Sequence, residues 1–185
     1  MVLPSRTFRG IGVAGWVVAG LLAGAVAGRG EGFSLESAGV RVGSQADHSN
    51  RDFGQVEGFG NLNLPWGWSL GKEWRLRSRL DLTVGWLGMR GDNAVIGTLG
   101  PSLVLSRAQL PLSLGGGVSP TLLSRDEFRS EDFGTVFQFT SYLGLSWDFA
   151  AHWRVGYRFQ HMSNAGLAAP NPGLNLHMFA LSYLF

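Results

Sequence analysis

The stretch Glu73-Trp-Arg-Leu-Arg-Ser-Arg-Leu-Asp-Leu-Thr-Val-Gly-Trp86 changes character from one residue to the next. Its even positions hold Trp, Leu, Ser, Leu, Leu, Val and Trp, whereas its odd positions are mostly charged or polar. Successive side chains of a β-strand point to opposite faces of a sheet, so the pattern predicts a strand with one apolar and one charged face.

The length of this segment and its two tryptophans favour a membrane strand over a soluble one. Strands of soluble sheets are usually ~5–6 residues long, and the alternation here runs without a break from residue 73 to residue 86. Outer-membrane barrels turn an apolar band toward lipid and carry aromatic residues at both edges of that band. Trp74 and Trp86 stand at the two ends of the apolar face, as such a girdle requires.

Seven further segments repeat the alternation, which gives eight predicted strands in all. In chain order the other seven cover residues 38–44, 56–68, 95–105, 110–120, 133–149, 153–159 and 179–185.

The predicted connections alternate between short turns and longer loops. The turns are residues 69–72, 106–109 and 149–151, and the loops are residues 47–55, 88–93, 121–132 and 164–173. Outer-membrane barrels have short periplasmic turns and longer outer loops. We therefore predict an all-β protein, an eight-stranded antiparallel transmembrane β-barrel of the outer-membrane type, with both termini in the periplasm.

The composition agrees with this fold class. The chain has 185 residues and no cysteine, which indicates one domain without disulfides or thiolate metal sites. It holds 28 Gly, 7 Trp and 12 Phe, and only 15% of its residues are charged, as is typical of a barrel in lipid. The net charge of +2 gives little reason to expect a nucleic-acid partner.

The first 27 residues have the pattern of a cleavable secretory signal peptide. Arg6 and Arg9 precede an uncharged run over residues 11–27, which ends in Ala25-Val26-Ala27. Small residues at those positions are typical of a cleavage site, which favours removal over a retained anchor helix. No later stretch approaches the ~20 apolar residues of a spanning helix. Residues 28–185 are thus predicted to form the exported barrel, located in the bacterial outer membrane.

The interior of so small a barrel is filled by side chains and leaves no pore. We expect the inward charged residues to form a polar plug of ion pairs, and these are Arg75, Arg77, Arg79, Asp81, Arg154 and Arg158. Function must then lie on the loops, on a rim or on the outer wall.

Two polar residues interrupt the apolar outward face of the seventh strand. By alternation, His161 and Ser163 point in the same direction as Phe159, toward lipid. Residues i and i+2 on one strand face lie side by side, so the imidazole can reach the serine hydroxyl. A nucleophile and its general base require this arrangement for ester hydrolysis. The spacing alone also fits a polar rim at the membrane surface.

A general base needs a third group that fixes its tautomer. Asn175 and His177 of the eighth strand are predicted to lie on the same wall as His161. An amide oxygen orients the histidine in Cys-His-Asn proteases, and Asn175 is the corresponding candidate here.

The segment Gln160-His161-Met162-Ser163-Asn164-Ala165-Gly166, followed by Asn171-Pro172-Gly173, resembles the outer-membrane lipid A 3-O-deacylase (PagL) family. The specific signature covers about residues 153–185. The resemblance implies an eight-stranded barrel and a carboxylic ester hydrolase that removes the 3-O-linked acyl chain of lipid A, without a cofactor or a metal. It implies His161 as general base and Ser163 as nucleophile. It places three more residues near the oxyanion region and its supporting loop: Asn164, Gly166 and Asn171.

The sequence departs from the family pattern at the third catalytic position. The family has a glutamate at the start of the last strand, where this chain has Asn175. An amide holds the tautomer of His161 but supplies no charge. Three acidic residues of the long loop are alternative partners for the histidine: Asp126, Glu127 and Glu131.

The expected partner is lipopolysaccharide of the outer leaflet, whose lipid A carries phosphates. Four arginines of predicted outer loops suit phosphate contacts or are merely solvated, and these are Arg51, Arg90, Arg125 and Arg129. The sequence leaves a homodimer open. Two alternative functions also stay open, a non-catalytic structural or adhesive barrel and a phospholipase. The four histidines show no metal-ligand spacing, so no metal site is expected.

Overall fold

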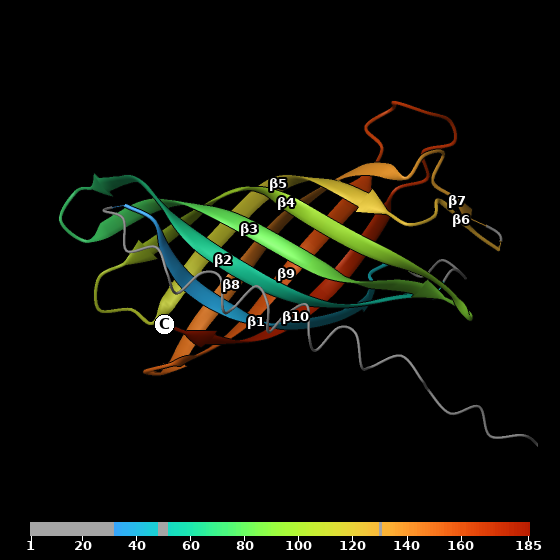
Figure 1. Cartoon of the computed structure of the whole chain (residues 1–185). Coiled ribbons are helices and arrows are strands. Elements are labelled where there is room, and N and C mark those ends of the chain that lie inside the picture. The colour runs from blue at the N-terminus through green and yellow to red at the C-terminus, as the bar shows by residue number, and fades with distance from the viewer. Residues whose placement is uncertain (1–31, 48–51, 130) are drawn as a thin grey trace, which may run out of the picture.

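Eight long strands form one closed antiparallel barrel in the computed structural model (Figure 1). The structure describes residues 32–47, 52–129 and 131–185, and the predicted signal peptide lies outside them. The barrel strands are β1 (Ser34–Gln45), β2 (Phe53–Leu70), β3 (Trp74–Met89), β4 (Asp92–Arg107), β5 (Leu112–Leu123), β8 (Phe137–Ala150), β9 (Trp153–Ser163) and β10 (Leu174–Leu184).

The strand order around the barrel is β1-β10-β9-β8-β5-β4-β3-β2, and the barrel closes where β1 pairs with β10. Two short strands, β6 (Glu127–Phe128) and β7 (Glu131–Asp132), form a small hairpin within the connection from β5 to β8. The predicted fold class, an all-β eight-stranded antiparallel barrel, is confirmed. No helix in the described ranges is long and apolar enough to cross a membrane.

The two faces of the strands differ as the alternation predicts. On β3, Trp74 and Trp86 are exposed on the outer wall, whereas Asp81 and Thr83 are buried inside. Tryptophans gather on the wall near the end with the short turns, at Trp66, Trp68, Trp74, Trp147 and Trp153. An apolar wall of this extent is not stable in water and is typical of a surface that lipid covers.

One predicted loop is wrong, because residues 88–93 are almost entirely strand. β3 continues to Met89 and β4 begins at Asp92, so only Arg90 and Gly91 form the turn. Both have a positive φ, 48° at Arg90 and 98° at Gly91. Two left-handed residues make the tight hairpin turn that matches the twist of the flanking strands. The glycines and charged residues of this segment are therefore signs of a turn and not of a long loop.

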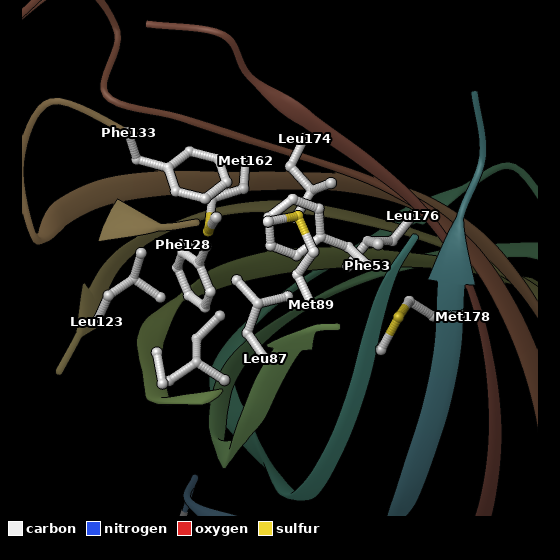
Figure 2. Packing of buried hydrophobic residues seen from close by; sticks show 12 residues of the cluster. Phe53, Leu87, Met89, Leu123, Phe128, Phe133, Met162, Leu174, Leu176 and Met178 are labelled. Carbon is white, nitrogen blue, oxygen red and sulfur yellow. The ribbon is translucent and has the colours of Figure 1, made fainter. Parts of the chain in front are cut away.

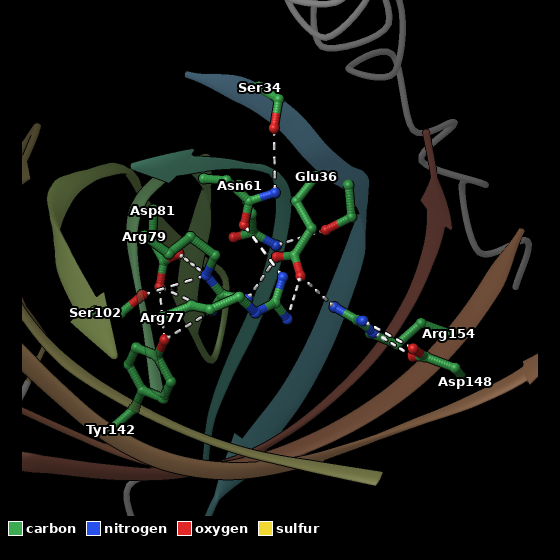
Figure 3. A network of polar contacts seen from close by, with 12 residues as sticks. Ser34, Glu36, Asn61, Arg77, Arg79, Asp81, Ser102, Tyr142, Asp148 and Arg154 are labelled. Atoms are coloured by element: carbon green, nitrogen blue, oxygen red, sulfur yellow. Dashed lines mark hydrogen bonds and ion pairs between the residues drawn. The ribbon is translucent and has the colours of Figure 1, made fainter. Parts of the chain in front are cut away.

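The polar half of the interior is a network of ion pairs, as predicted (Figure 3). Arg79 bridges Glu36 of β1 and Asp81 of its own strand, at 3.2 and 2.6 Å. Arg154 contacts the same Glu36 at 3.3 Å. Arg75 alone among the predicted inward residues is exposed, because it lies next to the turn that joins β2 to β3.

The other half of the interior is apolar, which the sequence analysis did not predict (Figure 2). Phe53, Phe128 and Phe133 are fully buried, with ring centroids 5.3 to 5.8 Å apart. They pack with inward residues of the strands, among them Leu87, Met89, Met162, Leu174, Leu176 and Met178. We call this cluster the apolar cap, since it fills the barrel at the end where β9 passes into β10.

Phe133 was predicted to begin a lipid-facing strand, and this is wrong. β8 begins at Phe137, and Phe133 lies between the β6–β7 hairpin and β8, within the connection from β5. Its side chain is 1% exposed within the apolar cap. The connection from β5 to β8 thus places aromatic side chains inside the end of the barrel. Strand periodicity cannot indicate such a tertiary contact.

Candidate active site

The residues of the candidate site come from the adjacent strands β9 and β10. His161 of β9 and Asn175 of β10 are directly opposite each other in the antiparallel register. His161 is exposed, whereas its neighbours Gln160 and Met162 are buried inside the barrel. Alternation along β9 therefore turns His161 and Ser163 away from the interior, with the apolar cap behind them.

A hydrogen bond of 2.8 Å joins His161 Nδ1 to Asn175 Oδ1. An amide oxygen only accepts, so the proton must lie on Nδ1, and Nε2 of the neutral ring keeps its lone pair. Asn175 thereby fixes the tautomer that a general base needs. It also occupies the nitrogen that an acidic residue of the long loop would have to contact.

Ser163 is the last residue of β9, on the same face as His161 and two residues further along. Within the described ranges no hydrogen bond joins the two side chains. Bonds between a nucleophile and its base are often loose before the substrate arrives. A second serine that the sequence analysis missed, Ser141 of β8, is opposite His161 on the other side. Cross-strand pairing places it there, and only the register could have revealed it.

The imidazole of His161 packs closely against Gly173. A β-carbon added to Gly173 would lie 3.1 Å from His161 Cε1 and 3.8 Å from Nε2. Gly173 immediately precedes β10, so it lies at the level of Ser163, one residue beyond the pair of Met162 and Leu174. The Nε2 edge of the ring therefore faces the Ser163 end of the wall.

The loop between β9 and β10 is held by the three residues that the sequence analysis associated with it. Asn164 is fully buried, and its Nδ2 donates to the carbonyl oxygens of Phe133, Ala168 and Pro170 at 2.9 to 3.1 Å. Its Oδ1 accepts from the N–H of Gly166 at 2.9 Å. Its own N–H donates to Asn171 Oδ1 at 3.1 Å.

His177 is not joined to His161. Its Nδ1 and Tyr157 Oη are 2.8 Å apart, and the two rings stack on the outer wall below the candidate site. Among the residues that the structure describes, no group of three or more His, Asp or Glu side chains is placed to hold a metal ion.

The loop arginines proposed for phosphate contacts have acidic partners. Arg90 pairs with Asp52 at 2.9 Å, and Arg125 pairs with Asp92 at 3.7 Å. The backbone N–H of Arg129 also donates to Asp92, at 3.1 Å. Arg51 lies outside the described residues. These aspartates offset much of the positive charge, and the phosphate contacts stay a prediction.

The fold is that of an outer-membrane β-barrel, and its outer wall carries His161, Ser163 and Asn175 on two adjacent strands. The family model described as lipid A 3-O-deacylase (PagL) matches residues 55–184. The chain belongs to this family, and the resemblance seen in the sequence is confirmed.

Two relatives are similar to the chain over different extents. A stretch of 69 residues is 36% identical to the lipid A deacylase PagL of Bordetella bronchiseptica; it covers 37% of this chain and 39% of that protein. The match thus spans less than half of the curated relative. The crystal structure of the outer membrane enzyme PagL superposes with a TM-score of 0.63 at 20% identity, over 80% of this chain and 99% of that one. This likeness shows the fold.

Proposed function

We propose that the protein is an outer-membrane serine esterase that removes the 3-O-linked acyl chain of lipid A. The observation that carries the proposal is the 2.8 Å bond from His161 Nδ1 to Asn175 Oδ1, on the same outward face as Ser163. This bond fixes the tautomer of a histidine that lies on the same face as a serine hydroxyl. The chain that carries both residues belongs to the deacylase family.

In the proposed reaction Ser163 Oγ attacks the ester carbonyl while His161 Nε2 takes the hydroxyl proton. The tetrahedral intermediate collapses, and the sugar oxygen leaves as an alcohol with the proton from His161. Water then attacks the acyl-Ser163 ester, again with His161 as base, and the free fatty acid departs. Asn175 orients the ring throughout and leaves the imidazolium without a neighbouring carboxylate.

The outer wall suits a substrate that stays in the membrane. Apolar side chains are exposed on the wall beside and below the site, among them Phe159 on β9, Leu143 on β8 and Phe179 on β10. Acyl chains of an outer-leaflet lipid can pack on them with no need to leave the bilayer. The ester of such a lipid then reaches Ser163 at the strand end. A homodimer is not required for this and stays a prediction.

Mass spectrometry of lipid A from cells that express the protein tests the proposal. We expect a new lipid A species that lacks one 3-hydroxyacyl chain, together with the matching free acid. Unchanged lipid A in membranes that contain the folded barrel would refute it. In that case, lysophospholipid in the same extract would favour a phospholipase, and unchanged phospholipid would favour a structural or adhesive barrel.

Asn175→Asp should raise the rate of acyl release about 10-fold. The variant keeps the length of the side chain and places a carboxylate against His161 Nδ1. Hydrogen bonds to charged groups contribute about 1.5–3 kcal/mol against about 0.5–1.5 kcal/mol for neutral ones, and a difference of ~1.4 kcal/mol corresponds to tenfold. Rates on purified lipid A in detergent micelles measure the effect. Asn175→Leu, which has no acceptor, should instead lose activity, and equal rates for all three proteins would contradict this role.

Gly173→Ala should lower the rate on the order of 10²-fold, the scale of a ~1 Å misplacement of a catalytic group. The φ of 63° is strained for alanine, and the new β-carbon contacts the ring of His161. Gly71→Ala is the matched control, because Gly71 has a φ of 76° at a turn with nothing within 4 Å of its β-carbon. Similar rates for the two variants would show that contact with His161 does not matter.

A further inference from the structure

A cavity in the polar half of the barrel interior is lined by arginines and, among the described residues, by no acidic side chain. Its volume is about 60 Å³, whereas a single buried water needs only ~10–15 Å³. Serine hydroxyls and the ring of Tyr142 complete the lining. Four guanidinium groups face the cavity, those of Arg41, Arg79, Arg154 and Arg158. The space therefore presents positive charge and hydrogen-bond donors to a ligand.

Two of these arginines belong to a network whose charges balance. Arg79 and Arg154 share Glu36, at 3.2 and 3.3 Å (Figure 3). The whole network consists of three arginines and three carboxylates, namely Arg77, Arg79, Arg154, Glu36, Asp81 and Asp148. These groups need no further counter-charge.

The other two arginines have only one carboxylate between them. Arg41 and Arg158 both form ion pairs with Glu57, the latter at 3.0 Å, and all three side chains are almost excluded from solvent. Among the described residues this triad thus carries one positive charge without a counter-charge. A buried charge is costly unless it is paired and hydrogen-bonded. The triad therefore favours a single negative charge beside it.

The hydrogen bonds of Arg158 leave donors for such a charge. In the described part of the chain, Nη2 is the only nitrogen of Arg158 that donates to another side chain, and its acceptors are Glu57 and Gln160. Nε is buried without an acceptor. The guanidinium lies over the ring of Tyr142, with Cζ 4.8 Å from the centroid. This contact holds the group in place at the cavity wall.

We propose that the cavity binds a small monovalent anion such as chloride, held by the guanidinium groups of Arg158 and Arg41. One negative charge balances the triad, and the guanidinium gains an acceptor. The volume admits a halide ion and excludes a lipid headgroup or a sugar acid. Ser113 and Ser146 of the cavity wall supply further donors. The site lies inside the barrel and does not depend on the esterase proposed for the outer wall.

Unfolding of the barrel by urea in detergent, followed by gel mobility, tests the site. An ion that binds only the folded protein raises the ratio of folded to unfolded protein in proportion to its concentration above the Kd. We therefore expect a tenfold rise in chloride to raise this ratio about tenfold. Gluconate, which is too large for the cavity, replaces chloride so that the ionic strength stays constant. A ratio that does not change with chloride overturns the proposal.

Arg158→Met and Arg41→Met each leave Glu57 with one partner, so the interior charges balance without an anion. Both variants should lose the dependence on chloride. Arg107→Met is the matched control, because Arg107 pairs with Glu73 at an exposed turn and its loss should leave the dependence unchanged. Retention of the dependence in both interior variants, or its loss in the control, overturns the proposal.

Crystals of the wild-type protein grown in bromide give a second measurement that needs no variant. We expect an anomalous scattering peak in the cavity, in contact with the guanidinium of Arg158. A cavity that holds only water under these conditions overturns the proposal.

Discussion

Ser163→Ala and His161→Ala should each reduce the release of 3-hydroxy fatty acid to background. In a soluble serine hydrolase, loss of the serine or of the histidine alone costs roughly 10⁶ in kcat, about as much as loss of the whole triad. We expect a loss of the same size here, because the serine and the histidine act together. Without Ser163 the base has no hydroxyl to deprotonate, and without His161 the hydroxyl keeps its proton. Lipid A mass spectra and a quantitative fatty-acid assay on purified barrels measure the loss.

Ser141→Ala is the matched control for this experiment. Ser141 is opposite His161 on β8, so two serines flank the same histidine from different sides. Ser163 is favoured because the Cε1–Nε2 edge of the ring lies against Gly173, at the Ser163 end of the wall. An inactive Ser141→Ala variant with an active Ser163→Ala variant would move the nucleophile to β8. Loss of gel mobility shift in any variant would point to misfolding instead.

The barrel could be predicted from the sequence because its governing rule is local. A period of two over each strand separates wall from interior, and Trp74 and Trp86 already indicate the two edges of the wall. The same rule places His161 and Ser163 on one face without any knowledge of their neighbours. The family resemblance then implies catalytic roles for two residues that the periodicity had already placed on the outer face.

Features that depend on contacts across the barrel could not be predicted in this way. Phe133 has the residue type and spacing of a wall residue, yet it is buried in the apolar cap because the β5–β8 connection turns inward. The choice between Asn175 and the loop acids for His161 required the register of β9 and β10. The hydrogen bonds of Asn164 and Asn171 depend on the path of the β9–β10 loop, which the sequence does not specify.

Interior charges missed by the sequence analysis meet at Glu57 of β2. The Glu57 side chain is fully buried. Its carboxylate forms one ion pair with Arg41 of β1 and another, at 3.0 Å, with Arg158 of β9. The alternation of β1 and β2 is weaker than that of β3, so neither Arg41 nor Glu57 was among the predicted inward residues. Of the three strands that Glu57 connects, β1 and β9 are the two neighbours of β10, which carries Asn175.

Glu57→Ala should destabilise the barrel by about 3–5 kcal/mol, the usual result of leaving a buried charge without its partner. Two guanidinium groups lose their shared carboxylate at once, and both are nearly excluded from solvent. Urea unfolding in detergent, followed by gel mobility, measures the change. Glu73→Ala is the control, since the Glu73–Arg107 pair is solvent-exposed at a short turn and should contribute at most about 1 kcal/mol. Equal effects would show that the interior pair is no more important than a surface one. We expect a larger effect for Glu57→Ala, and we expect this variant to lose acyl release at a lower urea concentration than the wild type. That result would mean that the ion pairs inside the barrel keep β9 and β10 in register. The hydrogen bond from His161 to Asn175 requires this register.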